Sequence, residues 1–167
     1  IALGANVVIA NAIGREDRDA AQRAVHTAVV FSLLGGTAVA ILGELVAAPV
    51  LSLLKMPSDV YPLALLYLRI YLAGMPVILL YNFEAAIFRS VGETRIPLIA
   101  LATSGVLNVM LNLFFVAVLH MSVDGVAIAT VISNAFSSLL LYRRLTIAEG
   151  YIHLDAKALR IHATSLR

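Results

Sequence analysis

Long apolar stretches separated by short polar loops dominate this chain of 167 residues. The segments 24–42, 61–88, 96–119 and 123–142 are each apolar over about the 20 residues that an α-helix needs to cross a bilayer, and the first could continue toward Leu54. Residues 1–13 are equally apolar but shorter, and we expect them to be the back half of a spanning helix. None of these segments carries the polar stripe of a helix in a soluble bundle. The pattern therefore predicts an all-α, polytopic transmembrane helix bundle.

Short loops join these segments and set the direction of each helix. Because each loop is only a few residues long, consecutive helices must run in opposite directions. One set of alternating loops carries Arg15, Arg18, Arg23, Arg89, Arg95, Arg143 and Arg144, whereas the opposite loops carry Lys55 alone. The positive-inside rule then places the loops near 14–23 and 89–95 and the C-terminal tail in the cytoplasm. We expect a multi-pass protein of the inner (plasma) membrane.

Composition agrees with a membrane chain and excludes several other classes. Hydrophobic residues make up 61% and charged residues 13% of the chain, against about 45–50% and 25% in soluble domains. The net charge of +2 is too small to indicate nucleic acid, so the lipid bilayer is the expected partner. The absence of cysteine excludes disulfides, a thiolate nucleophile and a cysteine metal site. Residues 146–167 are mixed polar and predict a cytoplasmic linker after a membrane domain over 1–145.

No enzyme motif is present in the sequence. It contains no phosphate-binding glycine loop, no nucleophile elbow and no pair of carboxylates at helical spacing within a span. His120 and Asp124 are four residues apart but flank a loop that contains Gly125, so a solvated turn is favoured over a metal site. We therefore expect a protein that is not an enzyme and that holds no resident cofactor or metal.

Polar residues inside two spans are the main candidates for a site. Asn108 and Asn112 are four residues apart and share one helix face. On the next helix Thr130, Asn134 and Ser137 also share a face, and the opposite helix directions bring Thr130 to a similar depth. Buried amides and hydroxyls hold helices together in lipid, and they also line ion and substrate cavities. The residues alone leave both interpretations open.

Two further positions inside the second full span stand out. Pro76, preceded by Gly74, predicts a kink because proline removes a backbone hydrogen bond. That kink is a candidate hinge in a moving protein and a simple bend in a static one. Glu84 lies near the end of the same span, where it could pair with Arg89 or Arg95, or line a cavity that faces the cytoplasm.

Several sequence runs together resemble the multidrug and toxic compound extrusion (MATE) family. The resemblance covers nearly the whole chain up to about Arg144, and it is most specific in the loops. The matching runs are Asn6 to Asp17, Tyr67 to Pro76, Tyr81-Asn82, Ala86 to Pro97, Leu107-Asn108, Leu111-Asn112 and Gly125 to Thr130. On this resemblance the chain corresponds to about helices 2 to 6 of a twelve-helix antiporter. It is then part of one six-helix lobe, and the second lobe is its partner in the same polypeptide.

The resemblance also implies a function. Members of this family export organic cations and other amphipathic small molecules in exchange for Na⁺ or H⁺. In one branch the first lobe binds its ion with an acidic residue of the first helix and polar groups of the fifth and sixth, to which Asn108, Asn112 and Thr130 correspond. Asn112 stands where that branch has an aspartate. An amide cannot exchange a proton, although its carbonyl oxygen can still coordinate Na⁺.

Two other functions remain as alternatives. A lipid or polysaccharide flippase of the same superfamily would share the helix pattern, and a membrane scaffold without transport would share the composition. On the MATE interpretation we expect this chain, as a fragment, to be inactive alone.

Overall fold

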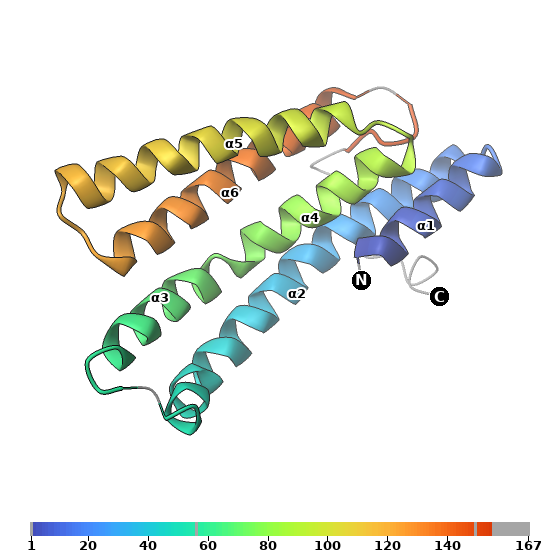
Figure 1. The fold of residues 1–167 in the computed structure, drawn as a ribbon. Helices are drawn as coiled ribbons and strands as arrows, with labels where there is room; N and C mark the ends of the chain where they lie inside the picture. Colours follow the sequence, from blue (N-terminus) through green and yellow to red (C-terminus); the bar gives the residue numbers. More distant parts are fainter. Residues whose placement is uncertain (1, 56, 149, 155–167) are drawn as a thin grey trace.

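The computed structural model describes residues 2–55, 57–148 and 150–154, and this part of the chain consists of helices and loops without a strand. The helices are α1 (Ala2–Gly14), α2 (Arg18–Leu53), α3 (Tyr61–Ala73), α4 (Met75–Ser90), α5 (Arg95–Leu113), the π-helix η1 (Phe114–Val118) and α6 (Val123–Ile147). In Figure 1, α5 and α6 lie side by side as a pair above α2 and α4, and α1 packs against α2 and α4. The fold is the predicted all-α bundle.

Within the described residues, three helices are long and apolar enough to cross a membrane, namely α2, α5 with η1, and α6. The pair α3 and α4 passes the same test when it is taken as one bent span, which gives four. α1 is a shorter apolar helix over the apolar segment 1–13, and its being half of a span stays a prediction. The predicted segments overlap the observed helices and differ from them at the helix ends, at the break between α3 and α4, and at η1.

α2 has 36 residues, where the apolar pattern predicted 24–42 with a continuation toward Leu54, so the difference lies at its start. Its first turn starts inside the charged loop, because the Asp17 carboxylate accepts a hydrogen bond from the Ala20 backbone N–H at 2.9 Å. At its other end the helix continues through Pro49 as far as Leu53. α6 likewise continues past the predicted end at 142, to Ile147.

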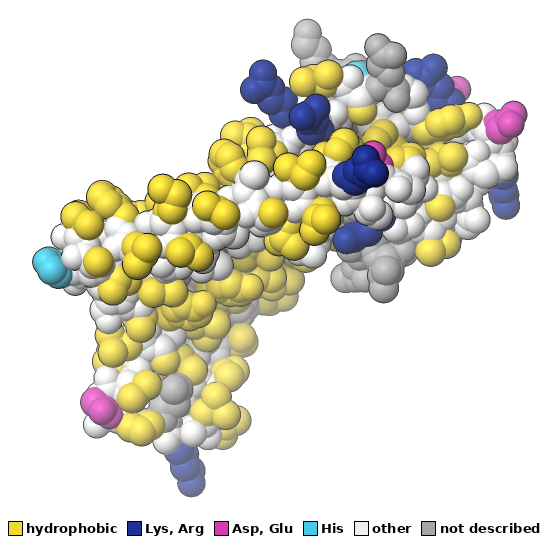
Figure 2. Space-filling model, turned by 45° about the horizontal axis from the view of Figure 1, so that its top comes forward, with side chains coloured by type: hydrophobic (Ala, Val, Ile, Leu, Met, Phe, Trp, Pro, Cys, Tyr) yellow, Lys and Arg dark blue, Asp and Glu magenta, His cyan; other side chains and the backbone are white. Residues whose placement is uncertain are grey.

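We call the end of the bundle that carries Arg15, Arg89, Arg95 and Arg143 the arginine end, and the opposite end the Lys55 end. Figure 2 shows most of the Lys and Arg side chains in view gathered at one end of the molecule, with another at a far tip. Between them the surface is largely hydrophobic, and large apolar side chains such as Leu45 and Leu98 are 70% and 65% exposed. An exposed apolar surface of this extent suits contact with lipid.

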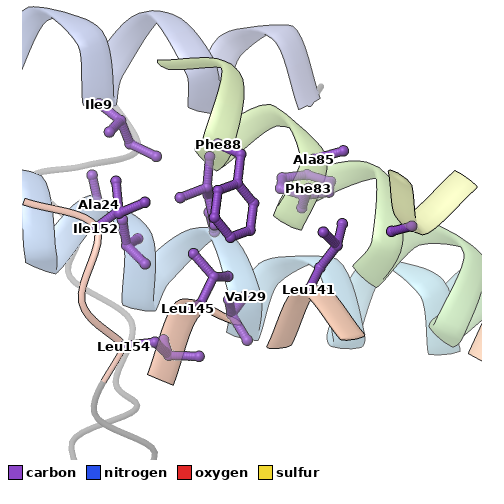
Figure 3. Packing of buried hydrophobic residues seen from close by; sticks show 14 residues of the cluster. Ile9, Ala24, Val29, Phe83, Ala85, Phe88, Leu141, Leu145, Ile152 and Leu154 are labelled. Carbon is purple, nitrogen blue, oxygen red and sulfur yellow. The ribbon is translucent and has the colours of Figure 1, made fainter. Parts of the chain in front are cut away.

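The buried core lies toward the arginine end, where α1, α2, α4 and α6 meet. Figure 3 shows Ile9, Val29, Phe88 and Leu145 packed against one another from these four helices. The segment 150–154 joins the same core, because Ile152 and Leu154 are buried and the Leu154 N–H donates to the Leu145 carbonyl at 3.1 Å. The first residues of the predicted linker are thus packed, while 155–167 lie outside the described residues.

Candidate cation site

The polar residues predicted on α5 and α6 meet at the interface between these two helices. The Asn108 amide nitrogen donates to the Ser133 hydroxyl at 3.1 Å and to the Thr130 hydroxyl at 3.5 Å. One turn further along α5, the Asn112 amide nitrogen donates to the Asn108 side-chain carbonyl at 2.9 Å. We call Asn108, Asn112, Thr130 and Ser133 the amide cluster. α5 and α6 are antiparallel, and Thr130 lies at a depth in the bundle similar to that of Asn108, as predicted.

The amide cluster contains an acceptor without a donor. The Asn112 side-chain carbonyl oxygen is buried and has no hydrogen-bond partner among the described residues. A buried polar atom without a partner costs about 1–3 kcal/mol, so such an atom needs an explanation. A carbonyl oxygen in this state, in a cluster that also holds the Asn108 carbonyl and the Thr130 hydroxyl, is a ligand of the kind that hard cations prefer.

A π-helix begins immediately beyond the cluster. α5 ends at Leu113, and η1 runs from Phe114 to Val118 before the chain turns into α6. Single π-helical turns occur frequently at functional sites, because they shift the residues around them relative to a regular helix. The sequence analysis treated 96–119 as one continuous helix, and the π-helical turn has no signal in the hydrophobic pattern.

Asn134 was also predicted for this site, but its side chain bonds to the backbone of its own helix and not to a side chain of the amide cluster. Its amide nitrogen donates to the Thr130 backbone carbonyl of its own helix at 2.8 Å. Ser133, which the sequence analysis passed over, takes the place beside Asn108 instead. The signal that could have identified Ser133 is its spacing of three residues from Thr130, which also places a side chain on the same helix face.

The predicted kink is present at Gly74 and Pro76. α3 ends at Ala73, α4 begins at Met75, and the two helices are bent by 49°. Gly36 of α2 lies directly against the bend, since a Cβ added there would be 2.4 Å from the Pro76 Cα atom. On the other side a Cβ added at Gly74 would lie 2.5 Å from a methyl group of Val131 on α6. The bend is therefore enclosed by α2 and α6, and its role as a hinge stays a prediction.

Glu84 does not pair with Arg89 or Arg95, contrary to one of the two predicted interpretations. Its side chain is fully buried, and the Ser138 hydroxyl of α6 donates to one carboxyl oxygen at 2.8 Å. Arg89 and Arg95 are exposed, and the ion pair found among the described residues joins Arg69 and Glu44 at 3.4 Å. In the same part of the chain no group of three or more His, Asp or Glu residues is placed to hold a metal ion.

Comparison with known proteins places this arrangement in a family. The sequence profile of the MatE family matches residues 1–114, which is more than half of the chain. The chain belongs to the MatE family.

Two curated relatives of this chain come from Bacillus subtilis (strain 168). The probable multidrug resistance protein YpnP is 36% identical over 89 residues, which are 53% of this chain and 20% of the relative. The probable multidrug resistance protein YoeA is 29% identical over 150 residues, 86% of this chain and 32% of the relative. This MatE-family chain thus spans about a third or less of these relatives, which are named as resistance proteins and not as enzymes.

Solved structures share the fold of this MatE-family chain. The inward-facing conformation of a multidrug resistance MATE family transporter of the MOP superfamily matches with a TM-score of 0.91 at 24% sequence identity. The match covers 99% of this chain and 38% of the transporter. The helices described above therefore form part of a MATE transporter fold.

Proposed function

We propose that this chain forms part of one lobe of a secondary active antiporter that exports organic cations or other amphipathic compounds in exchange for Na⁺ or H⁺. Membership of the MatE family and the names of the relatives support export as the activity. The second lobe would belong to the same polypeptide, since the matched transporter is much longer than this chain.

The observation that carries this proposal is the unpartnered Asn112 carbonyl oxygen in the amide cluster. Asn108 uses its amide nitrogen to join α5 to α6, which is the helix-binding role expected of a polar residue in lipid. Asn112 does not complete such a role, because its carbonyl accepts nothing from the described part of α6. A cation coordinated by this oxygen would supply the missing interaction.

The chemistry of the amide cluster favours Na⁺ over H⁺ as its ion. Amides and hydroxyls do not titrate near neutral pH, so none of the four side chains can carry a proton as part of a transport cycle. Their oxygen atoms are hard ligands, which suit alkali and alkaline-earth cations. We therefore assign Na⁺ to the amide cluster.

Replacing Thr130 tests the role of the cluster in export. Thr130→Val keeps the side-chain shape and removes one oxygen, so we expect the Na⁺ concentration for half-maximal export to rise about fivefold to tenfold, the equivalent of about 1–1.4 kcal/mol. The measurement is export of a fluorescent organic cation from vesicles that contain the transporter carrying this chain. Thr103→Val is the matched control, because the Thr103 hydroxyl bonds only to backbone carbonyls of its own helix. Equal Na⁺ dependence in both variants would contradict a cation site at Thr130.

We further propose that the arginine end faces the cytoplasm. This chain has no cysteine of its own, so it adds no background to the labelling of single introduced cysteines. Cysteines at Ser58 and Ser122 should react with an impermeant maleimide added to intact cells, and cysteines at Gly14 and Thr94 only after permeabilisation. Ser58, Ser122 and Thr94 are exposed, and a Cβ at Gly14 meets no neighbour within 4 Å. Labelling at 94 and not at 58 in intact cells would reverse the orientation.

A further inference from the structure

Glu84 is a buried carboxyl group that the amide cluster does not use. It is 0% exposed, in a helix whose neighbouring residues Phe83, Ala85 and Phe88 are also buried. One of its oxygens accepts from Ser138, and the other has no hydrogen-bond partner among the described residues. A carboxyl group taken out of water in this way is costly to keep ionised unless a cation or further donors accompany it.

On the helices packed against α4, no charged or titratable group of the described residues supplies such a cation to Glu84. α1 carries none among its described side chains, α5 has none after Arg95, and α6 has none between Asp124 and Tyr142. On α3 they are the tyrosines and Arg69, and Arg69 pairs with Glu44. On α4 itself they are Tyr81 and Arg89, and Arg89 is exposed.

Among the titratable side chains of α2, His26 lies nearest to Glu84 along the bundle axis. Phe31 of α2 packs on Phe83 of α4, and Gly36 lies against Pro76, so the two helices are antiparallel in this register. Counting residues along α2 and α4 from these two contacts, at a rise of 1.5 Å per residue, places His26 about one turn nearer the arginine end than Glu84. His26 is buried and has interactions of its own, and Arg23 lies about one further turn away.

A line of buried hydroxyls runs along α6 from the amide cluster to Glu84. Ser133 binds Asn108, Ser137 donates to the Ala100 carbonyl at 3.0 Å, and Ser138 donates to Glu84. All three serines are buried. The five residues from Ser133 to Ser138 correspond to a rise of about 7.5 Å, so Glu84 lies on the arginine side of the amide cluster and is joined to it by polar groups within an otherwise apolar interior.

We propose that Glu84, held by Ser138, is a proton-binding site of this lobe, separate from the amide cluster. A proton is the ligand that fits, because it needs one oxygen, whereas a hard metal cation is held by several oxygens at once. Ser138 is the side chain in the described structure that bonds to Glu84. The site goes beyond the proposed Na⁺ site, and it can exist on this chain whether or not the amide cluster binds an ion.

Infrared spectroscopy of the membrane-embedded chain tests this site directly. The C=O stretch of a buried protonated carboxyl group is separate from the bands of a carboxylate. We expect a difference spectrum between wild type and Glu84→Gln to contain this band, growing as the buffer is acidified and falling as it is made alkaline. Ser138→Ala should move the band to higher frequency, because the carboxyl group loses a hydrogen-bond donor. Glu16→Gln, in the exposed loop before α2, is the matched control and should remove only a hydrated carboxyl signal.

Two outcomes would overturn the proposal. A band that is absent from the difference spectrum would show that Glu84 takes up no proton, and a band that is the same at every pH would show a fixed structural carboxyl group. Neither outcome changes the Na⁺ dependence measured with Thr130→Val, so the failure of this site and the failure of the Na⁺ site are distinguishable.

Discussion

Gly36→Ala should destabilise the folded bundle, although alanine is the better helix former. The added Cβ would lie 2.4 Å from the Pro76 Cα atom and 2.9 Å from its nitrogen, and backbone atoms cannot move aside as a side chain can. α2 and α4 must therefore separate at the bend, at an expected cost of about 1–3 kcal/mol. The measurement is the loss of folded, monodisperse protein on heating in detergent.

Gly35→Ala is the matched control for this prediction. Gly35 is the preceding residue on the same helix, and a Cβ there meets no neighbour within 4 Å. Its replacement should be neutral or should stabilise by up to about 1 kcal/mol, the helix preference of alanine over glycine. Equal stability of the two variants would show that α2 and α4 do not approach closely at Pro76.

The bend between α3 and α4 allows a test of the hinge. Pro76→Ala restores a backbone N–H inside the bent span and should reduce the bend. If Pro76 is a hinge, export per folded molecule falls in this variant while stability is kept. If it is a static bend, the export rate is unchanged at equal protein level.

Asn112→Asp should make cation binding depend on pH. The wild-type amide cannot exchange a proton, whereas a carboxyl group at the same position binds either a proton or the cation. When ionised, its full charge should tighten Na⁺ binding by about tenfold, or about 1.4 kcal/mol. Acidification should then remove that gain, so the apparent Na⁺ affinity of the variant rises with pH. The readout is the Na⁺-dependent rise in thermal stability of the purified transporter at several pH values.

Asn112→Leu provides the opposite comparison. It removes the unpartnered carbonyl oxygen and the donor to Asn108, and it should abolish the Na⁺-dependent stabilisation in the folded protein. If the amide cluster serves only to hold α5 and α6 together, Asn112→Leu lowers stability without Na⁺ as well, and Asn112→Asp shows no pH dependence. Such a pair of results would remove the ion site and leave the helix contact.

The helical fold could be predicted because its signal is local. Apolar segments of spanning length, glycine and proline in the loops and the arginine asymmetry all lie in the sequence itself. The start of α2 was harder, since a charged first turn capped by Asp17 continues the helix beyond the apolar stretch. The start of that helix follows from capping and not from hydrophobicity.

The contacts of the site were predictable only in part. The spacing of Asn108 and Asn112 placed them on one face, and the antiparallel order brought Thr130 to them. The partner of Glu84 could not be predicted, because Ser138 lies 54 residues away and meets it only through the packing of α4 on α6. The close approach of α2 to Pro76 likewise depends on Gly36, and the position of the proline in the sequence does not reveal it.

Counter-movement of ions in vesicles tests the central claim most directly. Purified transporter carrying this chain is placed in vesicles without any ion gradient, and an organic cation is added on one side while Na⁺ movement is followed with a radioactive tracer. We expect substrate moving down its gradient to drive Na⁺ in the opposite direction, with the coupled Na⁺ flux lost in Asn112→Leu. Substrate movement without any opposing flux of Na⁺ or H⁺ would contradict an antiporter.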